Sequence, residues 1–240
     1  MTTRPSGRAP DELRSLHFER QFTKHAAGSV LVSFGDTRVL CTASVEERVP
    51  PWLRGADQGW LTAEYSMMPS STDTRKARDR NGRVDGRSVE IQRLIGRSVR
   101  AVTNLEVFGE RTIYIDCDVL QADGGTRTTS ISGAWVALHD LFLHMDSKRL
   151  LRQWPLEQQL GAVSIGAVKG EVLCDLCYEE DAGADVDMNV VMTSAGEFVE
   201  VQGGAEGATF SRETMDSMLA CAEGGIRQIF EAQRAAVEEG

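Results

Sequence analysis

The feature that most constrains the fold is the stretch DVLQADGGTRTTSISGAW, residues 118–135. It begins as the end of a β-strand, because it continues the β-rich run RTIYIDCDVL, and it ends as a helix. Between the two lie Gly124, Gly125 and a run of hydroxyl side chains around Arg127. We therefore expect a strand over residues 111–120 and a helix after Ser130, joined at the two glycines.

This turn carries the chemistry of an anion site. The N-terminus of a helix offers unpaired N–H groups and a partial positive charge. Gly125 lets the backbone approach a ligand closely, Thr126 supplies a hydroxyl, and Arg127 can bind phosphate through two parallel hydrogen bonds. The alternative is an ordinary capped helix start with a surface arginine, because the motif is neither a Walker nor a dinucleotide fingerprint.

The remaining chain alternates hairpins with long helices. Apolar alternation predicts hairpins over residues 28–47, 160–180 and 185–204, with turns at Gly35-Asp36, at Lys169-Gly170 and near Ala195-Gly196. A short strand is expected at residues 59–68, and a C-terminal helix with Ser211 as its N-cap. This order predicts an α+β fold of mixed or antiparallel sheets packed with α-helices. We expect the 240 residues to form one domain, residues 1–240.

A second long helix is expected at residues 87–102. Its apolar positions fall on one face at helical spacing and include Ile91, Leu94, Ile95, Val99 and Val102. Arg87 lies on that side, whereas Arg93, Arg97 and Arg100 lie opposite. A buried arginine needs an anionic partner, either a carboxylate or a bound phosphate. The alternative is an arginine that extends to solvent at the helix end.

The segment YEEDAGADVDMN, residues 178–189, contains a candidate pair of carboxylates. Asp181 is expected to end one strand region, and Asp187 to begin the next. A short connection would bring the two side chains together, where they could bind Mg²⁺ or where one could act as a general acid. An ordinary solvated acidic turn is the alternative.

The distribution of charge points to a polyanionic partner. The chain has a net charge of −10, which taken alone argues against such a partner. However, residues 74–100 hold nine Lys or Arg and three Asp or Glu. A basic block in an acidic chain indicates either nucleic-acid binding or a solvated charged face.

Several other classes of protein find no support in the sequence. No apolar run reaches the roughly 18 residues of a membrane span, and the polar N-terminus lacks the apolar core of a signal peptide. Five cysteines without such a signal predict free thiols and a cytoplasmic location. Cys174 and Cys177 lack the companions of a zinc site, and a serine-hydrolase motif is missing.

Several blocks of the sequence together resemble ribonuclease PH. The most specific are IDCDVLQADGGTRT and EIQRLIGR, others include YEEDAGADVDMNVVMT and FVEVQGGAEGATFSRE, and the likeness runs in order over nearly the whole chain. The resemblance implies the fold of the second domain of ribosomal protein S5. It also implies a phosphate-dependent 3′→5′ exoribonuclease that trims tRNA precursors, adds nucleotides in reverse, and assembles as a ring of six subunits.

The resemblance also implies roles for individual residues. The phosphate site maps onto Arg87, Gly125, Thr126 and Arg127, and the catalytic acids, which are also the candidate Mg²⁺ ligands, onto Asp181 and Asp187. The RNA contacts would come from Arg75, Arg78, Arg93 and Arg97. The sequence departs from the family at Ser70, where relatives have arginine, and at Ser6, where they have an acid.

In the expected reaction, inorganic phosphate attacks the last phosphodiester of an RNA 3′ end and releases a nucleoside diphosphate. Several cations are needed because two anions must meet. Two rivals remain: a hydrolytic exoribonuclease, which uses water, and a catalytically silent ring subunit that binds RNA for a partner. Silent relatives should lose the arginine or the acidic pair, and this chain keeps both.

Overall fold

The hairpin predicted around Gly35 and Asp36 forms the centre of a five-stranded sheet in the computed structural model, which describes residues 4–78, 85–205, 207 and 209–238. Its strands are β1 Leu16–Arg20, β2 Gly28–Phe34, β3 Thr37–Glu46, β4 Trp60–Met67 and β5 Thr112–Gln121. They lie in the order β1-β2-β3-β5-β4. All neighbours are antiparallel except β4 and β5, which are parallel, so the sheet is mixed as predicted.

The second sheet holds the other two predicted hairpins. Its strands are β6 Leu160–Val168, β7 Glu171–Cys174, β8 Val186–Thr193 and β9 Phe198–Ala205, in the order β7-β6-β8-β9 and all antiparallel. The turn between β6 and β7 uses positive φ at both Lys169 (52°) and Gly170 (82°). That conformation matches the twist of a hairpin, which explains why a Lys-Gly pair marks it in the sequence.

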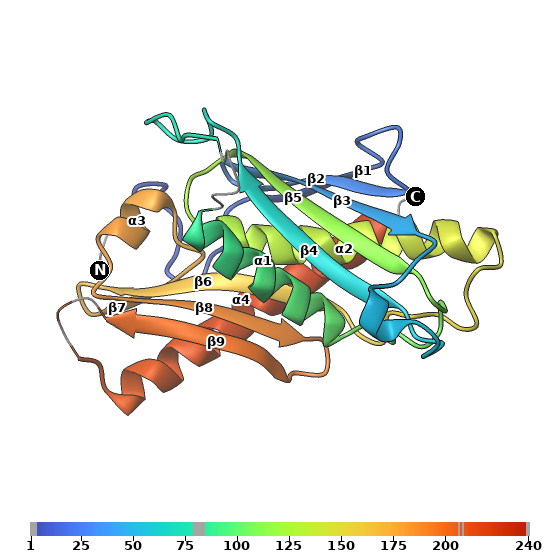
Figure 1. The fold of residues 1–240 in the computed structure, drawn as a ribbon. Coiled ribbons are helices and arrows are strands. Elements are labelled where there is room, and N and C mark those ends of the chain that lie inside the picture. The colour runs from blue at the N-terminus through green and yellow to red at the C-terminus, as the bar shows by residue number, and fades with distance from the viewer. Residues whose placement is uncertain (1–3, 79–84, 206, 208, 239–240) are drawn as a thin grey trace.

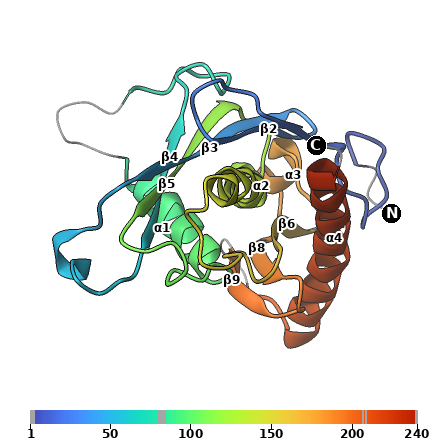
Figure 2. The same ribbon diagram turned by 90° about the vertical axis from the view of Figure 1, so that its right-hand side faces the viewer.

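Helix α2, Thr126–Ser147, runs through the middle of the molecule between the two sheets, as Figure 2 shows. It packs against β2 and β3 on one side and β6 on the other. Trp135, Leu138 and Phe142 are all buried, because a helix enclosed on every side is apolar all round.

The start of α2 corrects the sequence prediction. The helix begins at Thr126 and not after Ser130. The hydroxyl of Thr128 donates to the carbonyl of Gly125 over 2.8 Å, and that of Ser130 donates to Thr126 over the same distance. Because these polar side chains bond back onto the helix, a segment that resembles a loop in composition forms the first helical turn.

Each of the other two long helices packs mainly against one sheet, and Figure 1 shows their arrangement. Helix α1, Gly86–Arg100, packs against β4, and α4, Arg212–Glu238, packs against β6 and β7. Ser211 caps α4 as predicted, with its hydroxyl 3.1 Å from the amide of Thr214. A short helix, α3 Tyr178–Ala182, replaces the strand end expected there, and a 3-10 turn spans Pro51–Leu53.

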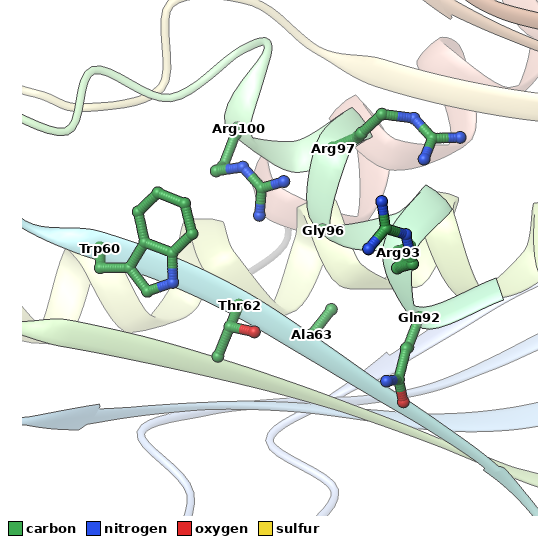
Figure 3. A pocket seen from close by; sticks show the side chains of 8 residues that line it. All are labelled: Trp60, Thr62, Ala63, Gln92, Arg93, Gly96, Arg97 and Arg100. Atoms are coloured by element: carbon green, nitrogen blue, oxygen red, sulfur yellow. The ribbon is translucent and has the colours of Figure 1, made fainter. Parts of the chain in front are cut away.

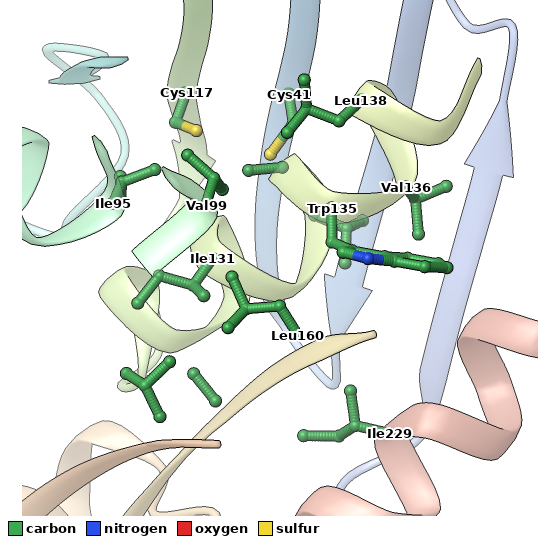
Figure 4. Packing of buried hydrophobic residues seen from close by; sticks show 14 of the residues in the cluster. Cys41, Ile95, Val99, Cys117, Ile131, Trp135, Val136, Leu138, Leu160 and Ile229 are labelled. Carbon is green, nitrogen blue, oxygen red and sulfur yellow. The ribbon is translucent and has the colours of Figure 1, made fainter. Parts of the chain in front are cut away.

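One apolar cluster joins the two sheets through α2, and Figure 4 shows part of it. Its members come from every layer and include Val99 of α1, Ile131 of α2, Leu160 of β6 and Ile229 of α4. The predicted apolar face of α1 is confirmed, because Ile91, Leu94, Ile95 and Val99 are each at most 1% exposed. The α+β fold with mixed sheets is therefore as predicted.

After β4 the chain enters a polar, basic segment that leads to α1. Its residues 70–78 lack helix and strand, and residues 79–84 lie outside the described residues. The amide of Ala122 donates to the carbonyl of Ser71 over 2.8 Å, which ties the loop to the end of β5. Across the described chain, no helix is long and apolar enough to cross a bilayer.

Candidate active site

The glycines at the end of β5 form a tight turn held from behind. Gly124 and Gly125 have φ values of 75° and 63°, in the left-handed region that favours glycine. A side chain at Gly124 would place its Cβ 2.5 Å from the carbonyl oxygen of Leu176. The hydroxyl of Thr37 donates to Gly124 over 2.6 Å and accepts from the amide of Asp123 over 2.9 Å. The turn is therefore rigid before any ligand arrives.

In front of this turn lies a cleft of about 100 Å³. It is lined by residues of α1, the glycine turn, α2, β6, α3 and β8: Arg87, Gly125, Thr126, Arg127, Ser164, Asp181, Asp187 and Asn189. The volume is several times the ~15 Å³ that one water needs, so a small oxyanion fits. All six residues predicted for phosphate binding and catalysis line this one cleft, although they span a hundred positions of the chain.

The two arginines enter the cleft from different helices. Arg127, in the first turn of α2, has a side chain 14% exposed and donates from Nη1 to Glu90 Oε1 over 3.1 Å and to Gln202 Oε1 over 3.0 Å. Arg87 lines the cleft from the start of α1, but it is exposed and not buried. Of the two alternatives for Arg87, the structure favours the arginine that extends to solvent, so burial does not force an anionic partner on it.

Thr126 is held in place by a buried tyrosine. Its hydroxyl lies 2.8 Å from the hydroxyl of Tyr65, which is 4% exposed on β4. Burial raises the pKa of Tyr65, against the opposing effects of the Thr126 hydrogen bond and the positive charges of Arg87 and Arg127. The phenol therefore stays neutral and can donate its hydrogen to Thr126, which frees the threonine proton for a ligand.

The two carboxylates face the arginines across the cleft. Asp187 lies on β8 as predicted, but Asp181 lies in α3 and not at a strand end. Partial burial raises the pKa of Asp181, the nearby Asp187 raises it further, and Arg87 and Arg127 partly offset both. This pattern is typical of a carboxyl group that can hold a proton and give it up, and it is common at active sites.

Helix α3 is anchored to the rest of the molecule at two points, and its own N-cap adds a third contact. The amide of Tyr178 donates to Asp123 Oδ1 over 3.2 Å, which joins α3 to the glycine turn. The amide of Cys177 donates to Glu180 over 3.0 Å, and Glu180 forms a buried ion pair with Arg4. These contacts fix the position of Asp181 relative to the glycine turn and the start of α2.

The donor set of the cleft fits Mg²⁺. Asp181, Asp187 and the side-chain carbonyl of Asn189 offer hard oxygen ligands in one place. Mg²⁺ usually takes one or two protein carboxylates and completes its shell with water and substrate phosphates. Within the described residues, no cluster of three or more His, Cys, Asp or Glu could hold a metal ion.

The arginines predicted to bind RNA lie outside this cleft. Figure 3 shows Arg93, Arg97 and Arg100 of α1 around a groove of about 370 Å³ opposite Trp60 and Thr62 of β4. Arg100 stacks on Trp60 with its guanidinium carbon 4.9 Å from the ring centroid, while Arg93 is exposed. The groove therefore offers cations and an aromatic face along one side of the molecule.

The remaining RNA candidates differ in how free they are. Arg97 forms two hydrogen bonds with Glu200 of β9, from Nε over 2.8 Å and from Nη2 over 2.6 Å. Arg75 and Arg78 are exposed in the loop after β4, and Arg78 lines a separate cavity beside α1. The structure thus brings the predicted phosphate-binding and acidic residues together in one cleft, whereas the four arginines predicted to bind RNA lie outside it.

Sequence reasoning missed the polar residues that complete the cleft. Ser164 on β6 and Asn189 on β8 are direct cross-strand partners, and both line it. Both lie in strands that are mostly buried and apolar. A polar residue in such a strand is the sequence signal that could have identified them. Glu90, Gln202 and Tyr65 support the site from outside, and only the fold brings them near it.

Sequence comparison decides the family. The profile of the 3′ exoribonuclease family, domain 1, matches residues 12–143, and that of domain 2 of the same family matches residues 158–225. The chain belongs to the 3′ exoribonuclease family. The resemblance to ribonuclease PH is thereby confirmed, as is the broad prediction of a role in RNA processing.

Solved structures show the same fold. Rice (Oryza sativa) Rrp46 superposes with a TM-score of 0.79 at 18% identity, over 97% of this chain and 99% of that one. A chain of the Archaeoglobus fulgidus exosome, with RNA bound to the active site, gives 0.78 at 22% identity, over 95% and 91%. An archaeal exosome core chain gives 0.78 at 21%, over 96% and 91%. At these identities the likeness establishes the fold.

Proposed function

We propose that this protein is a phosphate-dependent 3′→5′ exoribonuclease that shortens RNA and releases nucleoside diphosphates. The observation that carries the proposal is the cleft in which Arg87 and Arg127 face Asp181 and Asp187. Arginine is always charged and suits an oxyanion, and the N-terminus of α2 adds N–H groups and a partial positive charge. The family membership supplies the substrate class, an RNA 3′ end.

Inorganic phosphate is the anion that suits this cleft. Arg87, Arg127, the Thr126 hydroxyl and the amides after Gly125 would hold it. One of its oxygens attacks the phosphorus of the last phosphodiester, and the bond from phosphorus to the 3′-oxygen of the penultimate nucleotide breaks. The chain contributes positioning and charge neutralisation, which are the main needs of phosphoryl transfer.

The two carboxylates complete the reaction. A proton must reach the departing 3′-oxygen, and Asp181, whose pKa is raised by partial burial and by Asp187, is suited to supply it. Alternatively, the pair holds Mg²⁺, which would neutralise charge on the phosphates when bound. In both cases Asp187 acts through its position beside Asp181, which accounts for its place in the cleft.

The finer parts of the proposal concern substrate and assembly. We propose that the RNA is a tRNA precursor or another structured RNA with a 3′ extension, held through Arg75, Arg78, Arg93 and Arg97. A groove with exposed Arg93 and the aromatic face of Trp60 supports backbone binding. We further propose a homohexameric ring in the cytoplasm. The exosome chains of the same fold belong to multi-subunit assemblies, which supports association.

Product analysis tests the proposal. The purified protein is incubated with a 3′-extended tRNA and Mg²⁺, with and without inorganic phosphate, and the released nucleotides are identified by chromatography. We expect shortening that depends on phosphate and yields nucleoside diphosphates. Monophosphates released without phosphate would establish hydrolysis, and RNA binding without shortening would establish a catalytically silent subunit. Either outcome overturns the proposal.

A further inference from the structure

The strongest unexplained feature near the cleft is a closed set of three side chains around Arg127. Glu90 of α1 and Gln202 of β9 both accept from Arg127 Nη1, and Gln202 Nε2 donates to Glu90 Oε1 over 3.2 Å. We call Glu90 and Gln202 the brace. Each of the three residues contacts the other two, and they come from three separate elements.

We propose that the brace orients Arg127 for phosphate, an inference that rests on the proposed function. A guanidinium has five N–H donors, and the brace occupies the two on Nη1. Among the residues that the structure describes, Nε and Nη2 of Arg127 have no acceptor, so three donors in one plane remain for a ligand. Fixing one edge of the plane fixes the direction of the other, which two-point binding of phosphate requires.

The position of Glu90 also links the two arginines. It lies three residues after Arg87, so both side chains project from the same side of the first turns of α1. A shift of α1 would therefore move Arg87 directly and Arg127 through Glu90. The positions of Arg87 and Arg127, which come from different helices, therefore both depend on α1.

Charge and geometry make opposite demands on Glu90, and this allows them to be separated. A carboxylate on Arg127, in addition to Asp181 and Asp187 in the cleft, weakens the attraction of the site for an anion. If Glu90 acted through charge alone, its removal would strengthen phosphate binding. If it orients Arg127, its removal weakens binding, whereas a glutamine that keeps the acceptor oxygen preserves it.

The test compares Glu90→Ala with Glu90→Gln in the full-length protein. We expect Glu90→Ala to raise the KM for inorganic phosphate about tenfold, as the loss of a hydrogen bond to a charged group predicts. Glu90→Gln should stay within about twofold of wild type or bind phosphate more tightly, and the KM for RNA should change little in both. Equal lowering of the phosphate KM in both variants would overturn the proposal.

The second member of the brace gives an independent check. Gln202→Ala should also raise the phosphate KM, and the double variant with Glu90→Ala should cost less than the product of the two single effects, because both residues restrain the same nitrogen. Purely multiplicative effects contradict a shared role. Calorimetric titration with inorganic phosphate, without RNA, should give the same ranking of affinities.

A control separates this inference from the proposed function. Glu231→Ala removes an exposed charge from α4 and should leave every constant unchanged. If the wild-type protein does not shorten RNA in a phosphate-dependent way, the proposed function fails. If it does, and Glu90→Ala leaves the phosphate KM unchanged while the thermal unfolding profile is normal, the brace fails alone.

Discussion

Arg4 and Glu180, which are 176 residues apart in the chain, form a buried two-point ion pair next to Asp181. Nε of Arg4 lies 2.6 Å from Oε1 of Glu180, and Nη2 lies 2.8 Å from Oε2. The side chains are 0% and 4% exposed. The N-terminal segment is therefore part of what positions α3 and its candidate catalytic acid.

Breaking this pair should destabilise the protein strongly. We expect Arg4→Ala to lower the free energy of unfolding by about 3–5 kcal/mol, because it removes the two-point partner of buried Glu180 and leaves only Arg8, whose Nη2 lies 3.4 Å from Oε2. Urea unfolding measures the change. Arg212→Ala, which removes an exposed pair with Asp216, should cost at most about 1 kcal/mol. Comparable losses in the two variants would show that the buried pair does not hold the N-terminal segment.

The pair also predicts the direction of a pH effect. Burial alone would raise the pKa of Glu180, but the hydrogen bonds and charge of Arg4 outweigh it and hold that pKa below its usual range. A carboxyl group with a lowered folded-state pKa stabilises fully above its unfolded value, about 4.3, and loses this contribution as pH falls through the folded value. The stability gap between wild type and Glu180→Gln should therefore shrink on acidification below pH ~4.

The carboxyl group of Asp181 predicts an effect of pH on stability that has the opposite sign. Its folded-state pKa is raised by partial burial and by Asp187, so the ionised form opposes folding at neutral pH. Asp181→Asn should raise the melting temperature at pH 7 while it lowers activity. The gain should disappear below the ordinary aspartate pKa of about 3.9, where the wild-type carboxyl group is protonated in both states. A melting temperature below that of wild type at pH 7 would contradict this assignment.

The glycine turn predicts a contrast between two identical substitutions. Gly124→Ala places a Cβ 2.5 Å from a backbone oxygen at a positive φ, and we expect a loss of about 1–3 kcal/mol of stability together with weaker phosphate binding. Gly224→Ala lies in α4 with open space around it and should stabilise by about 0.5–1 kcal/mol. Thermal unfolding of both variants tests the pair, and equal effects would rule out a strained turn.

The hairpins could be predicted from the sequence because their signals are local. Apolar alternation sets the strands, and a pair such as Lys169-Gly170 sets the turn. The start of α2 could not, because the helix depends on hydroxyl-to-carbonyl hydrogen bonds that resemble loop chemistry in composition. Helix α3 was missed for a similar reason, since five residues are too few to show helical periodicity.

The residues of the site fall into the same two groups, those with a local sequence signal and those without one. Gly125, Thr126 and Arg127 lie together in the chain, and their residue types indicate an anion site. For Arg87 and the acidic pair the residues left a structural alternative open, and the family resemblance favoured the site. Arg4, Glu90 and Gln202 carry no such signal, because each is an ordinary polar residue until the fold brings it to its partner. Contacts between distant segments are what a single sequence does not display.

Arg127 should matter for phosphate and little for RNA. We expect Arg127→Ala to abolish phosphate-dependent shortening while RNA affinity, measured by fluorescence anisotropy, stays near wild type. Asp187→Asn keeps both arginines, so it should bind phosphate, remain folded by circular dichroism and lose turnover. Equal loss of RNA affinity in Arg127→Ala, or wild-type turnover in Asp187→Asn, would contradict the division of roles in the cleft.

Arg93 should contribute more to RNA binding than Arg97, although both lie on the outer face of α1. Arg93 is exposed, whereas Arg97 already donates two hydrogen bonds to Glu200, and RNA must compete with that carboxylate. We expect Arg93→Ala to weaken RNA binding and to reduce the slope of log affinity against log salt by about 0.7, the value for one phosphate of a single strand. Arg97→Ala should have a smaller effect, and Glu200→Gln, which releases Arg97, should tighten binding. Anisotropy titrations over a range of salt concentrations measure all three, and a steeper loss in Arg97→Ala than in Arg93→Ala would show that the ion pair opens when RNA binds.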